Sequence, residues 1–250
     1  MINLKDKVAI VTGASSEKGR AICLALADSK AKVAIHCYKN KEIAMSLMKD
    51  IQGRGGMAFV VQADIRNQKE VINLFHDVVK QAGTVDVLVN NAHPNILRNS
   101  FIKTTWKEHQ DQLDVITKGS YFCIQECLKV MLKKHCGSII NILNAQIDMP
   151  VKGYSSFTTA ISSMIGMTRN LALEVGDKGV RVNMIAPGFT VTKKTPHASK
   201  DIQEAIKART SLNRLATPED IANATLFFSS NLSSFITGSY LIVDGGNFML

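Results

Sequence analysis

Short apolar runs alternate with amphipathic stretches along the whole chain. Runs such as KVAIVT at 7–12 and VDVLVN at 85–90 are continuous and rich in valine, which is typical of strands buried on both faces of a parallel sheet. Strands are predicted at 7–12, 32–36, 57–62, 85–90, 137–143, 181–186 and 240–244. A helical period predicts helices near 19–29, 41–53, 67–82, 107–134, 157–176 and 218–229.

Regular alternation of strands and helices predicts an α/β fold, a Rossmann-type doubly wound parallel sheet of about seven strands with helices on both faces. No linker, repeat or low-complexity stretch interrupts the pattern, so a single domain is expected over residues 1–250. The segment 189–216 lacks strand character and follows the carboxyl end of a strand, where such folds bind ligands. We therefore expect a lid at 189–216.

Composition narrows the class of protein. With 46% hydrophobic and 20% charged residues, the chain resembles an ordinary globular protein. No run reaches the roughly 18 apolar residues of a membrane span, and MINLKDKVAIVTG lacks the apolar core of a signal peptide, so a cytoplasmic location is expected. The five cysteines form no CxxC pair, which argues against a disulfide framework and against a metal site.

The net charge of +9 raises the question of an anionic partner. A lysine-rich solvated surface explains the charge most simply. Nucleic acid is disfavoured because only 6% of the residues are aromatic. Among anionic partners, an acidic acyl carrier protein or a phosphate-bearing acyl-CoA fits better.

Several motifs occur in one order across the chain: TGASSEKGR after the first strand, AD at 63–64, NNA at 90–92, TRNLALE at 168–174, RVNMIAPG at 181–188 and DGG at 244–246. In order and spacing the chain resembles the short-chain dehydrogenase/reductase family, most closely the 3-oxoacyl-thioester (acyl carrier protein) reductases. The resemblance implies hydride transfer with NAD or NADP. It also implies cofactor-binding roles for Gly13, Ser15, Gly19, Asp64, Asn90, Pro187 and Gly188.

The four catalytic positions of that family carry other residues here. Counting from TRNLALE and from the strand GSIINIL places the family's tyrosine at Phe157 and its lysine at Ile161. The serine position is Asn144 and the asparagine position is Ile116. Phenylalanine has no proton to give, and a positioned general acid typically contributes about 10²- to 10⁴-fold in rate. Tyr154 and His93 are weak candidates to substitute.

The predicted cofactor loop also departs from the family pattern. Glu17 stands where the resemblance implies a glycine beside the pyrophosphate, and Lys18 follows it. A carboxylate at a helix N-terminus repels a phosphate there, and His93 fills space beside the predicted nicotinamide site. We therefore expect no dinucleotide binding, or weak binding. Any residual binding should favour NADP, since Lys39 and Lys41 follow the second strand without an acidic residue.

These observations lead first to the hypothesis of a non-catalytic subunit or partner of an active hydroxyacyl or 3-oxoacyl thioester oxidoreductase. The resemblance implies association through the helices at 107–134 and 157–176, as a homo-oligomer or with an active paralogue. One alternative is a non-redox enzyme, a cyclase, isomerase or dehydratase. Its polar groups would be Asn144, His93, Tyr154 and Asp148. The other alternative is an NADP-dependent reductase with displaced catalytic residues.

Overall fold

The computed structural model describes residues 2–96, 98–192 and 199–249. This part of the chain forms a seven-stranded sheet in the order β3-β2-β1-β4-β5-β6-β7, with every neighbouring pair parallel. The strands are β1 Val8–Val11, β2 Lys32–Cys37, β3 Met57–Gln62, β4 Val87–Asn90, β5 Gly137–Ile142, β6 Val180–Pro187 and β7 Tyr240–Val243. The predicted Rossmann-type fold class is confirmed.

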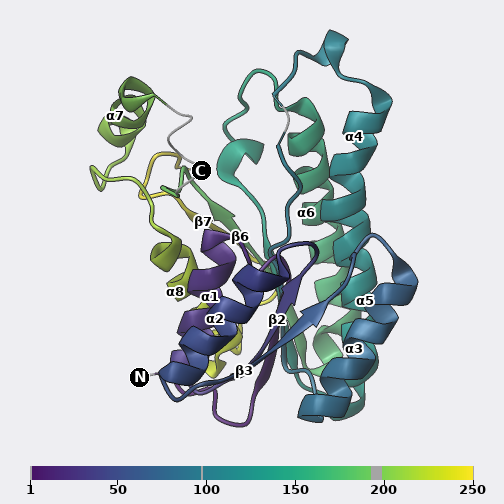
Figure 1. Ribbon diagram of the computed structural model, residues 1–250. Coiled ribbons are helices and arrows are strands. Elements are labelled where there is room, and N and C mark those ends of the chain that lie inside the picture. Colours follow the sequence, from purple (N-terminus) through teal and green to yellow (C-terminus); the bar gives the residue numbers. More distant parts are fainter. Residues whose placement is uncertain (1, 97, 193–198, 250) are drawn as a thin grey trace.

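Helices cover both faces of the sheet (Figure 1). They are α1 Glu17–Asp28, α2 Lys41–Gly53, α3 Gln68–Ala82, α4 Trp106–Leu113, α5 Gly119–Met131, α6 Ser155–Val175, α7 Lys200–Arg209 and α8 Pro218–Ser229. One apolar core lies between the sheet and α1, α2 and α8, and a second lies between the sheet and α3, α5 and α6. This arrangement leaves the carboxyl ends of the strands open at one edge. No described helix is both long enough and apolar enough to cross a bilayer.

The structure departs from the predicted helix at 107–134. A π-helical turn, Asp114–Lys118, separates α4 from α5. Such a turn accommodates one extra residue in a single turn, whereas the hydrophobic pattern over 107–134 predicted one continuous helix. Ile116 lies within this turn and is buried.

Backbone hydrogen bonds join the two ends of the predicted lid segment, 189–216. The Val191 N–H group donates to the Ala216 carbonyl at 2.9 Å, and the Ala216 N–H group donates to the Phe189 carbonyl at 3.3 Å. α7 lies within this region, whereas residues 193–198 lie outside the described residues. Closure of this segment over a ligand stays a prediction.

Candidate functional site

The loop after β1 is bound to the end of β4. The Thr12 Oγ1 atom accepts from the N–H groups of Asn91 at 3.0 Å and Ala92 at 3.1 Å. The Asn91 side-chain amide donates to the carbonyls of Thr12 and Gly13. Because these bonds join two parallel strands at their carboxyl ends, they hold the loop at the edge of the sheet where this class of fold binds ligands.

Two glycines in this loop cannot be replaced without movement of the backbone. Gly13 has φ of +62°, and a Cβ atom there would lie 2.7 Å from the Ala92 Cα atom. A Cβ atom on Gly19 would lie 2.6 Å from the Gly13 carbonyl oxygen. Ser15 is half-buried in the turn between them. The close packing that a dinucleotide loop requires is therefore present at Gly13 and Gly19.

His36 on β2 fixes the same loop from the other side. Its Nδ1 atom accepts from the Gly13 N–H group at 3.2 Å, and its Nε2 atom lies 3.0 Å from the Ala63 carbonyl. This pairing requires a neutral ring with the proton on Nε2. Burial lowers the pKa of His36, which favours the neutral form. The sequence motifs did not indicate this residue, because its partners lie on other segments.

Two charged side chains lie at the N-terminus of α1. Glu17 is the first residue of the helix, and Lys18 beside it is half-buried. Burial lowers the pKa of Lys18 to about 8, so the amine is still mostly protonated at neutral pH. The carboxylate expected to repel a pyrophosphate therefore has a cation next to it in the chain.

His93 lies beside the predicted catalytic position. Its Nδ1 atom is 2.9 Å from the Asn91 carbonyl, and its ring centroid is 5.9 Å from that of Phe157. Burial, together with the charge of Lys18, lowers the pKa of His93 to about 4. The ring is therefore neutral, with its proton donated to Asn91, and Nε2 is left as an acceptor. In this state His93 cannot give a proton to a substrate carbonyl.

We expect His93 to make folding sensitive to acid. An unfolded histidine has a pKa near 6.5, so between about pH 6.5 and pH 4 the unfolded chain binds a proton that the folded chain does not. The free energy of unfolding should fall in that range by up to about 1.4 kcal/mol per pH unit from this residue. His93→Gln should flatten the slope, measured by urea unfolding between pH 7 and pH 4.5. The control His76→Gln should leave the slope unchanged, since the His76 side chain is 74% exposed. Equal slopes in the parent and His93→Gln would contradict the expectation.

Three of the four catalytic positions form an apolar cluster. Ile116, Phe157 and Ile161 are buried together with Leu143, Met164 and Met184. Phe157 is 1% exposed and Ile161 is fully buried. Asn144 instead uses its side-chain oxygen to accept from the Gln146 N–H group at 2.9 Å, which caps a short 3₁₀ turn. None of these four side chains carries a group that titrates near neutral pH.

Two tyrosines border this cluster. Tyr154 precedes the first turn of α6, packs against the cluster, and has the Arg98 guanidinium 5.8 Å above its ring. Within the described residues the Tyr154 hydroxyl makes no hydrogen bond. The Tyr240 hydroxyl, in contrast, donates to Asp148 at 2.5 Å. Burial and this bond raise the pKa of Tyr240.

A second polar cluster lies at the carboxyl ends of β2 and β3. Arg66 donates through Nε and Nη2 to the Asp64 carboxylate at 2.6–3.0 Å, and through Nη2 to the Tyr38 hydroxyl at 3.1 Å. The Arg66 guanidinium lowers the pKa of Asp64. The Lys39 Nζ atom lies 5.2 Å from the Tyr38 ring centroid. The cluster therefore contains two cationic side chains, Lys39 and Arg66, and one carboxylate, Asp64. Sequence reasoning identified Lys39 and Asp64 but missed Arg66.

The remaining predicted cofactor residues lie at the ends of β4 and β6. The Asn90 amide nitrogen donates to the Asn141 side-chain oxygen at 2.8 Å, while the Asn90 side-chain oxygen is buried without a partner in the described structure. Pro187 ends β6, and the Gly188 N–H group donates to the Val243 carbonyl at 2.9 Å. A Cβ atom on Gly188 would lie 2.6 Å from the Asp244 Cβ atom, so only glycine fits there.

Several described residues are compatible with a dinucleotide at this edge of the sheet. Gly13 and Gly19 allow close backbone contacts at the two ends of the loop, and the buried side-chain oxygens of Asn90 and Asn91 have no donor in the described structure. Lys18 places a positive charge beside Glu17. Lys39 follows β2, where such folds hold the ribose of the cofactor, and Arg66 after β3 bonds to Tyr38 beside it.

Comparison with known proteins agrees with this geometry. A family model described as Enoyl-(Acyl carrier protein) reductase matches residues 13–247. A 3-oxoacyl-(acyl-carrier-protein) reductase FabG from Staphylococcus epidermidis is 35% identical over 245 residues, covering 98% of this chain and all of that protein. A 3-oxoacyl-(acyl-carrier-protein) reductase from Synechocystis is 34% identical over 251 residues, with both chains fully covered. The crystal structure of a putative gluconate dehydrogenase from Agrobacterium tumefaciens superimposes with a TM-score of 0.95 at 26% identity, with both chains fully covered.

The fold and the loop after β1 define an α/β protein of the Rossmann type. With relatives matched over nearly its entire length, the chain belongs to the short-chain dehydrogenase/reductase family. The hypothesis of a non-catalytic subunit is wrong, because these full-length relatives are named as reductases and nothing in the comparisons points to a loss of catalysis. That hypothesis rested on the four replaced side chains and on the departures at Glu17 and His93.

Proposed function

We propose that this chain is an NADP(H)-dependent reductase of acyl thioesters. The observation that carries the proposal is the match over the full length of the chain to relatives named as acyl-carrier-protein reductases. The close backbone packing at Gly13 and Gly19 and the cluster of Lys39 and Arg66 support it independently. A bound NADPH would supply the hydride.

The protein's own groups must then bind the substrate oxygen and provide a proton. The Tyr154 ring packs on the cluster that contains Phe157, and Arg98 places a positive charge beside that ring. The Asn144 amide nitrogen, which has no acceptor among the described residues, can donate to the same oxygen. The apolar cluster of Ile116, Phe157 and Ile161 excludes water from this side of the site. In this proposal Tyr154 donates the proton.

The direct test is NADPH oxidation by the purified chain with two thioesters. A 3-oxoacyl and a 2-enoyl pantetheine thioester should both be offered, since the relatives and the family model are named for these two kinds of reductase. We expect substrate-dependent turnover with at least one, at a rate within the ordinary enzyme range of about 1–10³ per second. Binding of NADPH without turnover on either thioester would refute the proposed activity.

We expect Arg66 to set the preference for NADPH. A charge-assisted hydrogen bond contributes about 1.5–3 kcal/mol, so Arg66→Ala should weaken NADPH binding by roughly ten- to a hundredfold. NADH, which lacks the 2′-phosphate, should bind almost equally to both forms. Fluorescence titration with the two cofactors measures the change. The control is Arg54→Ala, which removes an exposed arginine paired with Asp28.

Assembly, location and carrier binding remain proposals. Tyr121 on α5 and Leu173 on α6 are exposed, and Leu173 is 83% accessible, which supports association through these two helices. We also propose a single-domain protein that acts in the cytoplasm on substrates carried by an acyl carrier protein or coenzyme A, as a homo-oligomer or with a paralogue.

A further inference from the structure

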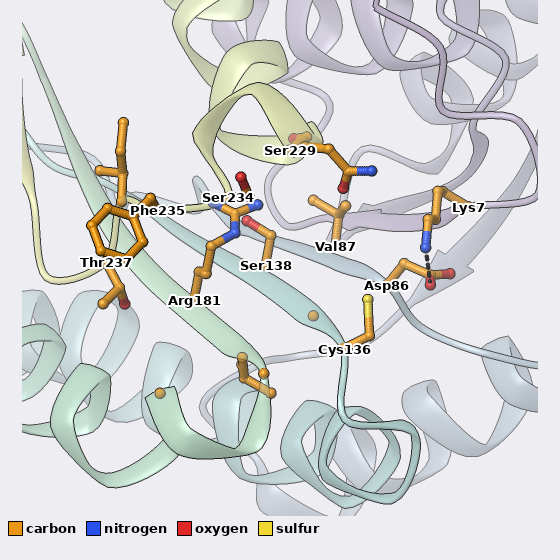
Figure 2. A pocket seen from close by; sticks show the side chains of 16 residues that line it. Lys7, Asp86, Val87, Cys136, Ser138, Arg181, Ser229, Ser234, Phe235 and Thr237 are labelled. Atoms are coloured by element: carbon orange, nitrogen blue, oxygen red, sulfur yellow. Dashed lines mark hydrogen bonds and ion pairs between the residues drawn. The ribbon is translucent and has the colours of Figure 1, made fainter.

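A cavity lies at the opposite end of the strands from the candidate active site. Its volume is about 540 Å³, within the range of small-molecule sites. The walls come from the amino ends of four strands and from the segment between α8 and β7. Figure 2 shows the cavity running from Phe235 and Thr237 at one end, past Arg181 and Ser234, to Cys136 and the Lys7–Asp86 pair at the other. Neither the loop of Gly13 and Gly19 nor the apolar cluster around Phe157 contributes to the walls of this cavity.

Arg181 is the central charged group of this cavity. Its Nη1 group donates to the Ser233 hydroxyl at 2.8 Å, and its Nη2 group donates to the carbonyls of Phe228 at 2.9 Å and Ser230 at 3.2 Å. All three acceptors are neutral. In the described structure Arg181 forms no ion pair, and its Nε–H and second Nη1–H groups have no acceptor. A half-buried cation therefore keeps two unused donors at the cavity.

The surrounding charges reinforce a positive field. Asp86 is the acidic group of the wall, and it is already paired with Lys7 at 3.4 Å and with Lys134 at 2.6 Å. Arg181, Lys7 and Lys134 against Asp86 leave two positive charges at this edge, three minus one. Burial lowers the pKa of Arg181, which is the cost of holding a guanidinium without a counter-ion. A bound anion would relieve that cost.

The rim of the cavity offers further groups for a ligand. The side chains of Asn231 and Ser234 are exposed and make no hydrogen bond within the described residues. Phe235 is fully exposed on the same rim, so one face of its ring is open for stacking. These groups suit a ligand with an oxyanion at one end and a flat apolar body at the other.

We propose that the cavity around Arg181 is a binding site for a small organic oxyanion, a carboxylate or phosphate monoester with a planar body. The oxyanion accepts from the unused guanidinium N–H groups and from Ser234, and the planar body covers Phe235. This site is separate from the proposed reductase site and takes a different ligand from the thioester.

Cys136 supplies a reporter that does not depend on activity. It is the exposed cysteine on the cavity wall, whereas Cys23, Cys37, Cys123 and Cys127 are buried. Alkylation of the native protein should therefore modify Cys136, with Cys136→Ser as the blank. Iodoacetate is itself a small carboxylate, and iodoacetamide is its neutral counterpart. Their rate ratio at Cys136, divided by the ratio for N-acetylcysteine, measures attraction of an oxyanion into the cavity.

We expect this normalised ratio to be raised about tenfold at low salt by the positive field. Phenyl phosphate should protect Cys136 from iodoacetamide in a saturable way, and inorganic phosphate should protect it more weakly because it lacks the ring. Arg181→Met should abolish both effects. A normalised ratio near one, or protection that does not saturate, would overturn the proposal.

Two further variants separate binding from folding. Arg181 also bonds to three neighbouring oxygens, so Arg181→Met is accepted only with an unchanged circular dichroism spectrum and melting temperature. Ser234→Ala and Phe235→Ala leave those bonds in place. We expect Phe235→Ala to reduce the advantage of phenyl phosphate over phosphate several-fold and to leave the iodoacetate ratio intact. If phenyl phosphate and phosphate protect Cys136 in Ser234→Ala and in Phe235→Ala as they do in the parent, the assigned ligand class is wrong.

Discussion

Tyr154→Phe should lower the turnover number of the reductase by about 10²- to 10⁴-fold, the usual contribution of a positioned general acid. The change removes one oxygen atom and keeps the ring that packs against the apolar cluster below Arg98. The KM for the thioester should therefore change much less than kcat. Steady-state kinetics with NADPH and the better of the two thioesters gives both values.

Two other tyrosines serve as controls for this result. Tyr121→Phe removes a hydroxyl on α5 that accepts from Gln125, and it should leave kcat unchanged. Tyr240→Phe removes the hydroxyl bonded to Asp148 on the other side of the cluster. If Tyr154→Phe retains full turnover while Tyr240→Phe loses it, the proton comes from Tyr240, and the assignment to Tyr154 fails.

The fold could be predicted from the sequence because its pattern is local. Continuous runs such as VDVLVN become strands when both faces are buried, and each run found its place in the parallel sheet. The start of α8 was also readable, since Thr217 and Asp220 form the reciprocal bonds of a capping box. The π-turn at Ile116 was not, because a phase shift of one residue at a single turn is hard to separate from the ordinary irregularity of an amphipathic helix.

The candidate site could be predicted only in part from the sequence, for a different reason. Gly13 and Gly19 were identified through motifs, and the structure gives the close contacts that require them. His36 was missed because it meets Gly13 across 23 positions of sequence. Arg66 lies only two residues from Asp64, but its bond to Tyr38 depends on the pairing of β2 with β3.

The error about function has a physical origin as well. Loss of an acid at 157 and a cation at 161 describes what those two positions cannot do. It does not describe which hydroxyl or amide lies near them after folding. Tyr154, the N-cap residue directly before α6, was only a weak candidate in the sequence, whereas in the structure its ring packs on the cluster that contains Phe157.

Restoring the family's lysine should damage the protein rather than repair it. Ile161→Lys places an ammonium group in a cluster whose buried members are Ile116, Phe157 and other apolar residues. An uncompensated buried charge typically costs about 3–5 kcal/mol. The free energy of unfolding, measured with urea at pH 7, should fall by about that amount. Ile161→Met, which keeps the volume and adds no charge, should cost less than about 1.5 kcal/mol.

The double change Phe157→Tyr with Ile161→Lys tests whether the two positions are coupled. A tyrosine hydroxyl at 157 offers the ammonium one hydrogen-bond partner, so the double variant should be less destabilised than the sum of the two single variants. Additive losses would mean that the two side chains do not meet in this cluster. If Ile161→Lys alone is as stable as the parent, the ammonium group has reached water or an anion. The apolar cluster would then be open to solvent, which contradicts the water-excluding role that the Tyr154 proposal gives it.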